Sequence, residues 1–151
     1  MSRALASVLA LVFAMAAGCV EGRPAPAALE AGESCSFCRM GVSDQRLAAQ
    51  LVARGQEPRF FDDVGCLRGF LADAKAPVAG VAYVADHRTG RWIEARAALY
   101  TRAERVPTPM GSHLLAHADA GSREADTDAR GGTGLTVGEL FGPDGPPGGE
   151  R

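Results

Sequence analysis

Three sulfur-bearing side chains lie within six residues at positions 35–40, whose sequence is Cys-Ser-Phe-Cys-Arg-Met. Thiolate and thioether groups are soft donors, and soft donors select Cu(I) over hard ions such as Mg²⁺ or Ca²⁺. A thioether adds little to a zinc site, so Met40 distinguishes this segment from an ordinary zinc-binding Cys-x-x-Cys pair. The residue types and their spacing therefore predict a site for monovalent copper.

Cys38 is the first candidate ligand. Its thiolate is the copper-binding form, and metal binding drives deprotonation of a thiol whose ordinary pKa is about 8.5. Met40 follows two residues later, so in an extended segment both side chains project to the same side, where Met40 either binds the ion or fills the core. For Cys35, three roles remain open: a second thiolate ligand, a disulfide partner of Cys38 in the metal-free protein, or no part in the site.

Met110 is a second candidate thioether, because the preceding Pro-Thr-Pro at 107–109 stiffens the backbone that leads to it. His113 and His117 follow Met110 at the third and seventh positions, and either imidazole could complete a mixed sulfur and nitrogen site. Lone histidines are more often solvated than ligating, so both roles stay open, with His113 placed ahead of His117.

Cys66 lies in a predicted helix, beside Val64 and Leu67 on its apolar face. This position favours a buried, unreactive thiol over a ligand. Asp62 and Asp63 precede the helix, where either can cap the first turn. Carboxylates are hard donors and suit Cu(I) poorly, so neither aspartate is a candidate ligand.

The elements that position these residues follow from the hydrophobic periodicity. The helix that starts after Asp62 or Asp63 is expected to run to about Asp73, because its apolar residues share one face and Pro77 lies beyond its end. Alternation and β-branched content predict strands at 47–53, 59–61, 78–85 and 92–95, with a turn at 87–90. The resulting order is strand, strand, helix, strand.

A second, fainter copy of this order follows. Residues 40–43 with 47–50 have a loose counterpart in 110–112 with 114–117, about 70 residues later. A polar helix at 122–130 and a strand at 135–137 would complete the copy. The predicted fold is α+β, with two small ββαβ lobes at 33–90 and 91–141, the second of them degenerate.

The two ends of the chain differ in composition from this folded part. Residues 1–18 combine Arg3 with an apolar run at 5–17, which is typical of an export signal, and cleavage before Cys19 would leave a cysteine for lipidation. The alternative is an ordinary cleaved signal in which Cys19 has no role. We expect residues 19–32 to form a flexible tether, residues 142–151 to be a disordered tail, and the protein to be anchored at the periplasmic face of a bacterial membrane. Val20, in place of an aspartate, favours the outer membrane.

Charge and motifs exclude several classes of function. The 151-residue chain has a formal net charge of −2 with acidic and basic residues interspersed, so a nucleic-acid partner has no electrostatic support. Three thiols remain if Cys19 is lipidated, and an odd number cannot all pair internally. The sequence lacks a nucleophile-and-base pattern, a phosphate-binding glycine loop and a His-Glu-x-x-His motif, so we do not expect an enzyme.

The sequence resembles the NosL family, the lipid-anchored accessory proteins of nitrous oxide reductase. The similarity runs from the lipobox through residues 35–40, 60–66, 83–84, 92–97 with Tyr100, and 109–111. The resemblance implies two ββαβ domains and a periplasmic Cu(I) chaperone that delivers copper to the maturation machinery of nitrous oxide reductase, either a membrane complex or the apo-reductase. It also implies that the metal-binding sulfurs are Cys38, Met40 and Met110. Arg39 stands where the family commonly has glycine.

Two other functions remain as alternatives. A thiol-disulfide redox protein would use Cys35 and Cys38, but it would not need the methionines and would usually present its Cys-x-x-Cys pair at a helix N-terminus. A zinc-stabilised interaction module would need a closed set of four cysteine or histidine ligands. The thiolate and thioether cluster therefore favours the copper chaperone.

Overall fold

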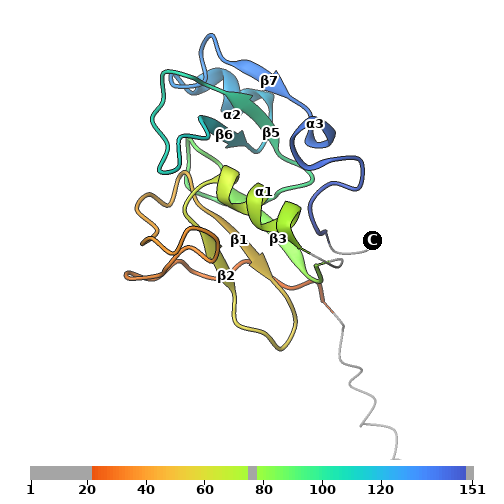
Figure 1. Cartoon of the computed structure of the whole chain (residues 1–151). Helices are drawn as coiled ribbons and strands as arrows, with labels where there is room; N and C mark the ends of the chain where they lie inside the picture. Colours follow the sequence, from red (N-terminus) through yellow and green to blue (C-terminus); the bar gives the residue numbers. More distant parts are fainter. Residues whose placement is uncertain (1–21, 75–77, 149–151) are drawn as a thin grey trace, which may run out of the picture.

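The first sheet and its helix form the lower half of the molecule in Figure 1. The computed structural model describes residues 22–74 and 78–148. Strands β1 (Ala49–Val52), β2 (Arg59–Phe61), β3 (Val81–Ala85) and β4 (Trp92–Glu94) pair antiparallel in the order β2-β1-β3-β4, and helix α1 (Val64–Asp73) packs against this sheet. The predicted strands at 59–61, 78–85 and 92–95 and the predicted helix are thus confirmed to within a few residues.

A second, smaller sheet forms the upper half. Strands β5 (Leu99–Arg102), β6 (Leu114–His117) and β7 (Thr133–Leu135) pair antiparallel in the order β6-β5-β7, with helices α2 (Ala120–Ala125) and α3 (Val137–Phe141) beside them. The prediction of an α+β fold with two small lobes is therefore confirmed, including the strand, strand, helix, strand order of the second lobe. Strand β4 belongs to the first sheet, so that sheet continues past residue 90, where the sequence analysis ended the first lobe.

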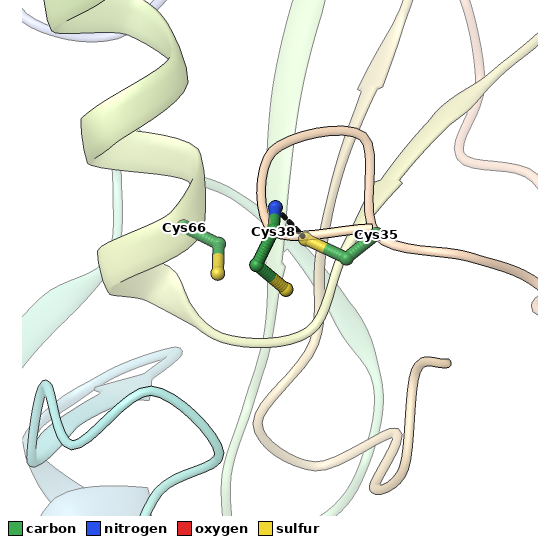
Figure 2. A group of neighbouring side chains, drawn as sticks. All are labelled: Cys35, Cys38 and Cys66. Carbon is green, nitrogen blue, oxygen red and sulfur yellow. Dashed lines mark hydrogen bonds between the residues drawn. The ribbon is translucent and has the colours of Figure 1, made fainter. Parts of the chain in front are cut away.

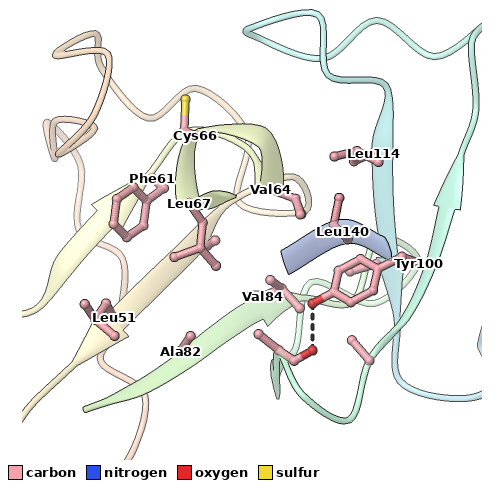
Figure 3. Packing of buried hydrophobic residues seen from close by; sticks show 14 of the residues in the cluster. Leu51, Phe61, Val64, Cys66, Leu67, Ala82, Val84, Tyr100, Leu114 and Leu140 are labelled. Carbon is pink, nitrogen blue, oxygen red and sulfur yellow. Dashed lines mark hydrogen bonds between the residues drawn. The ribbon is translucent and has the colours of Figure 1, made fainter. Parts of the chain in front are cut away.

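One hydrophobic core runs through both lobes (Figure 3). Phe61, Leu67 and Val84 enter it from the first lobe, whereas Tyr100 and Leu114 enter it from the second. The Tyr100 hydroxyl donates a hydrogen bond of 2.8 Å to the Ala95 carbonyl, so this large side chain is buried with its polar atom paired. Because the lobes share a core, they pack as one unit. Strand β6 of the second lobe contacts α1 and β3 of the first.

The segments next to both termini are ordered where the structure describes them, contrary to the predicted tether and tail. Gln50 is a fully buried polar residue of β1, and its amide exchanges hydrogen bonds of 2.8 and 3.1 Å with the backbone of Ala27. The Tyr83 hydroxyl donates to the Pro24 carbonyl at 2.6 Å. A buried amide needs such partners, and this need holds residues 22–32 against the sheet.

The C-terminal segment is held in a similar way. The Ala82 N–H of β3 donates to the Pro147 carbonyl at 2.8 Å, and the Arg96 guanidinium donates to the Asp144 carbonyl at 2.9 Å. The sequence analysis expected a disordered tail at 142–151, whereas these hydrogen bonds place Asp144 and Pro147 against the first lobe. Helix α3, just before this segment, was not predicted.

The predicted export signal and the lipidation site Cys19 lie outside the described residues. Within residues 22–74 and 78–148, none of the helices has the length and apolar character needed to cross a membrane.

Candidate metal centre

Cys35, Cys38 and Cys66 meet at the start of α1 (Figure 2). Their sulfur atoms all lie within 4.8 Å of one another. Two of the thiols come from the loop before β1, and the third comes from the first turn of α1. The cluster therefore joins two segments about 30 residues apart.

The loop that carries Cys35 and Cys38 is a tight turn closed by its own backbone. The Cys35 N–H donates to the Met40 carbonyl at 2.8 Å, and the Arg39 N–H donates to the Cys35 carbonyl at 3.0 Å. The Cys38 N–H points at the Cys35 sulfur, 3.4 Å away. Arg39 closes the turn with a φ of 69°, in the left-handed region that favours glycine. This conformation explains why a glycine suits the position.

The loop contacts both the sheet and the helix, and Gly69 makes room for it on the helix. The Ser36 N–H donates to the Phe60 carbonyl of β2 at 2.7 Å. The Phe37 ring lies over Gly69 of α1, where an added Cβ would be 2.6 Å from the nearest ring carbon. A larger residue at 69 would require the partly exposed Phe37 ring to shift.

The three thiols differ in their protonation. Burial alone would raise the pKa of Cys35, but backbone hydrogen bonds from Cys38, Asp62 and Phe37 outweigh it and lower the pKa overall. Burial raises the pKa of Cys38, and the neighbouring Cys35 raises it further. Burial and the negative charge of Asp63 raise the pKa of Cys66 well above its ordinary value. The hydrogen bonds to its sulfur therefore favour the thiolate form of Cys35, a fully buried residue. The sequence analysis ranked Cys38 first as a ligand, because its thiolate and the thioether of Met40 can face the same ion; the hydrogen bonds to the Cys35 sulfur are not visible in the sequence.

Asp63 links the cysteine cluster to the loop that carries Met110. One carboxylate oxygen, Oδ1, accepts the Cys66 N–H at 2.8 Å and caps α1. The other, Oδ2, accepts the Ser112 hydroxyl at 2.9 Å and the Met110 N–H at 3.3 Å. Gly65 makes this docking possible, since an added Cβ would lie 2.5 Å from that of Ser112. The capping role predicted for this aspartate is confirmed, and its second oxygen holds the two lobes together at the site.

Met40 and Met110 both lie at the surface. Their exposed fractions are 49% and 47%, so neither side chain fills the core. Met40 is in the same turn as Cys38, and Met110 is in the loop that Asp63 holds on the first turn of α1. One neutral thioether is thus in the cysteine turn, and the other is in the loop that is hydrogen-bonded to Asp63.

The histidines lie outside the cysteine cluster. His113 is bound within its own loop, where its Nδ1 lies 2.8 Å from the Val106 carbonyl. His117 is fully buried and lies beside Asp126 and His87. Within the described residues, the group of ligating side chains around Cys38 consists of Cys35 and Cys66.

The sequence analysis did not expect Cys66 to lie with the other two thiols. Cys66 is buried on the apolar face of α1, as predicted, yet its sulfur lies with the other two. A helical pattern cannot show that the Cys-x-x-Cys turn folds onto this face. The odd number of thiols was the signal that pointed to a third sulfur in the site.

Three sulfur donors without a histidine fit a site for a soft ion. They fit a structural zinc site or a thiol-disulfide redox pair less well. A structural zinc site would require a fourth cysteine or histidine. A redox pair would gain reactivity from a helix N-terminus, but Cys35 and Cys38 lie in a turn before β1.

Comparisons with known proteins agree with this geometry. The NosL family matches residues 26–141, which confirms the resemblance inferred from the sequence. Among solved structures, the chain is similar to the crystal structure of the copper chaperone NosL from Shewanella denitrificans, with a TM-score of 0.67 and 18% sequence identity. The similarity covers 80% of this chain and 98% of the other. The search of curated proteins found no match.

Proposed function

The chain belongs to the NosL family, and on that premise we propose that it is a copper chaperone that carries Cu(I) on the sulfur atoms of Cys35, Cys38 and Cys66. The observation that carries the proposal is the convergence of these three sulfurs within 4.8 Å. A metal–thiolate bond is about 2.3 Å long at zinc, and three such bonds in a plane separate the sulfurs by about 4 Å. One ion can therefore bind all three with little movement of the chain.

Protonation supports loading of this cluster by a soft cation. The lowered pKa of Cys35 provides the first thiolate, and the bound cation then favours deprotonation of the other two thiols. Three cysteine sulfurs offer Mg²⁺ no hard donor and offer Zn(II) no fourth ligand. The type and number of the ligands therefore favour Cu(I). The protein would act as a carrier with Cu(I) as its cargo, and not as an enzyme.

Release of the cargo requires access, which the exposed methionines support. Cys38 is the least buried of the three cysteines, and Met40 follows it in the same turn. We propose that Met40 and Met110 meet at the copper ion on this open side, where they would take the place of the more deeply buried thiolates beside Cys38. Thioethers are neutral and weak ligands, so a partner's donors can replace them before they attack the thiolates.

The place and the recipient are part of the same proposal. Residues 1–18 would direct export, and lipidation of Cys19 would hold the protein at the periplasmic face of a bacterial membrane, with the outer membrane favoured by Val20. The recipient would be the copper-delivery machinery of nitrous oxide reductase, as the sequence resemblance implies.

The test is a competition between metals on the reduced protein. We expect the purified chain to bind one Cu(I) under anaerobic conditions, in competition with a chromophoric Cu(I) chelator, and to prefer it over Zn(II). X-ray absorption at the copper edge should then show sulfur in the first shell. A first shell of nitrogen and oxygen, or one zinc retained at the cysteines against Cu(I), would contradict the proposal.

A further inference from the structure

A second group of ligating side chains lies away from the cysteines, at the contact between the two lobes. His87 is in the turn after β3, His117 ends β6, and Asp126 follows α2 directly. The Asp126 Oδ2 atom lies 2.7 Å from His87 Nδ1 and 2.9 Å from His117 Nε2. The three ligand atoms all lie within 4.8 Å of one another. The first lobe supplies one of these side chains and the second lobe supplies two.

All three side chains are buried, with exposed fractions of 4% for His87, 0% for His117 and 6% for Asp126. Burial alone would raise the pKa of Asp126, but hydrogen bonds from the two histidines and from the Asp128 backbone lower it overall. The buried carboxyl group of Asp126 is therefore in direct contact with both imidazoles. Buried charges in proteins are usually paired with an opposite charge or bound to a metal.

The hydrogen bonds leave part of this group unsatisfied. The Nδ1 atom of His117 is buried without a hydrogen-bond partner among the described residues. The other carboxylate oxygen of Asp126, Oδ1, accepts the Asp128 N–H at 3.0 Å. This orphaned atom faces away from Asp126, because His117 approaches the carboxylate through Nε2, so the case for an ion rests on the three converging ligand atoms.

We propose that His87, His117 and Asp126 form a second metal site, for a borderline divalent ion such as Zn(II). Imidazole and carboxylate are ligands that Zn(II) accepts and that Cu(I) disfavours relative to sulfur. Bonds of about 2.0–2.2 Å around a tetrahedral ion would place the ligand atoms about 3.3 Å apart. The oxygen–nitrogen distances of 2.7 and 2.9 Å would need to open by only about 0.5 Å, which small rotations of the side chains can supply.

An ion here would join the lobes, because its ligands come from both. The neighbouring backbone is already rigid, since the His87 N–H donates to the Ala116 carbonyl of β6 at 2.8 Å. Asp126 could supply a fourth donor atom through Oδ1, in exchange for its hydrogen bond to Asp128. The site does not use the cysteines, so it stands independently of the proposed copper function.

The experiment adds a divalent ion to protein whose cysteines are already occupied. The purified full chain is saturated with Cu(I) under anaerobic conditions and then titrated with Co(II), followed by Zn(II). We expect one equivalent of Co(II) to bind with visible ligand-field bands and without a thiolate charge-transfer band, and Zn(II) to displace it. Failure to bind a divalent equivalent would overturn the proposal and leave the group as a hydrogen-bonded contact only.

Variants identify the ligands. His117→Gln and Asp126→Asn should each weaken Co(II) binding more than about 100-fold, because even residues outside the ligand set typically contribute 10–100-fold. His113→Gln is the matched control: it removes the remaining histidine of the chain, which is bonded to Val106, and should leave binding unchanged. Loss of binding in His113→Gln, or wild-type binding in both ligand variants, would overturn the assignment.

A measurement on the wild-type protein covers the case in which the buried variants fail to fold. Nitrogen NMR of the labelled, Cu(I)-loaded chain should show the ring signals of His87 and His117 shifting on addition of Zn(II), while those of His113 stay in place. Ring signals that do not respond to Zn(II) would equally overturn the site.

Discussion

The cysteine cluster and the His87–His117–Asp126 group each bring three ligating side chains together, but they differ in exposure and in their place in the fold. The cysteine cluster lies at one end of α1, between loops that also carry two half-exposed methionines. The histidine and aspartate group is closed within the contact between the lobes. An ion that must be passed to a partner needs an accessible site, whereas an ion that stabilises a fold is best enclosed. The two groups are therefore suited to different ions and to different residence times.

The cysteine cluster and the histidine and aspartate group also differ in the backbone strain of the loops around them. In the part of the chain that the structure describes, two non-glycine residues have positive φ: Arg39 at 69° and His113 at 55°. One is in the loop of Met40 and the other is in the loop of Met110. Strained backbone conformations are common at functional sites. The turns that carry His87 and Asp126, both within the described residues, contain no non-glycine residue with a positive φ.

The largest effect we expect is on copper affinity in Cys35→Ser. Removal of the thiol with the lowered pKa should weaken Cu(I) binding by more than about 10³-fold, or about 4 kcal/mol. Anaerobic competition with a Cu(I) chelator measures the loss, and Ser36→Ala is the neighbouring control. Zn(II) binding at the histidine group should be unchanged. Equal loss of both metals would show that the two regions are not independent.

Asp63→Asn tests the link between the cysteines and the second lobe. An asparagine oxygen can still cap Cys66, but its NH₂ group would face the Met110 N–H and the Ser112 hydroxyl. We expect a loss of about 2 kcal/mol in unfolding free energy, typical of buried polar groups left unpaired, and about tenfold weaker Cu(I) binding.

The matched control for this change is Asp119→Asn, which alters the N-cap of the short helix α2. Urea denaturation with and without Cu(I) compares the two variants. If Asp63→Asn loses stability but keeps wild-type Cu(I) affinity, Asp63 has a structural role only.

These effects also show which parts of the protein the sequence could predict. Helix α1 was predictable because Asp63, the apolar face and the following proline are local signals, and β2 was predicted at its observed residues. Helix α3 was missed although Thr136 and Glu139 form a capping box, because the glycines around it dominate the local composition. Cys66 joins Cys35 and Cys38, and His87 joins His117 and Asp126, through tertiary packing alone. Such contacts have no fixed spacing that a sequence pattern could show.

Asp86, which directly precedes His87, provides a test of the lobe contact in protein kept free of divalent metal. Burial alone would raise its pKa, but hydrogen bonds from Ser122, Ala118 and Thr89 lower the pKa of Asp86 to about 2. Because the folded pKa lies below the unfolded value, Asp86 stabilises the fold above about pH 4, and this stability is lost as the pH falls toward 2. The shift corresponds to about 2 kcal/mol at neutral pH.

Asp86→Asn should therefore lower the unfolding free energy by about 2 kcal/mol at pH 7 and by much less near pH 2. Urea denaturation of the wild type and the variant across this range measures the difference, and Asp128→Asn serves as an exposed control. A difference that does not change with pH would mean that the carboxylate charge does not stabilise the lobe contact.

Met40→Ala and Met110→Ala separate the open side of the copper site from the core. Both side chains are about half exposed, so their removal should change the unfolding free energy by less than about 0.5 kcal/mol. Each change should weaken Cu(I) binding about tenfold, or 1.4 kcal/mol, if its thioether contributes to the site. Leu99→Ala, which removes a similarly exposed apolar side chain, is the control. Wild-type copper affinity in Met110→Ala would remove that methionine from the proposed site.

The smallest expected effect is that of Arg39→Gly, which tests whether the strain in the cysteine loop matters. A left-handed conformation costs a residue with a side chain about 1–2 kcal/mol, and glycine avoids this cost. Glycine also loses more entropy on folding, by about 0.5–1 kcal/mol, so we expect a net gain of roughly 0.5 kcal/mol in unfolding free energy. Copper affinity should stay the same, because the Arg39 side chain supplies no donor to the cluster. His113→Gly relieves strain at the other such residue but also removes the hydrogen bond to the Val106 carbonyl, so it should gain less stability. If Arg39→Gly instead weakens Cu(I) binding, the strained turn itself holds Cys35 and Cys38 at the spacing that the ion requires.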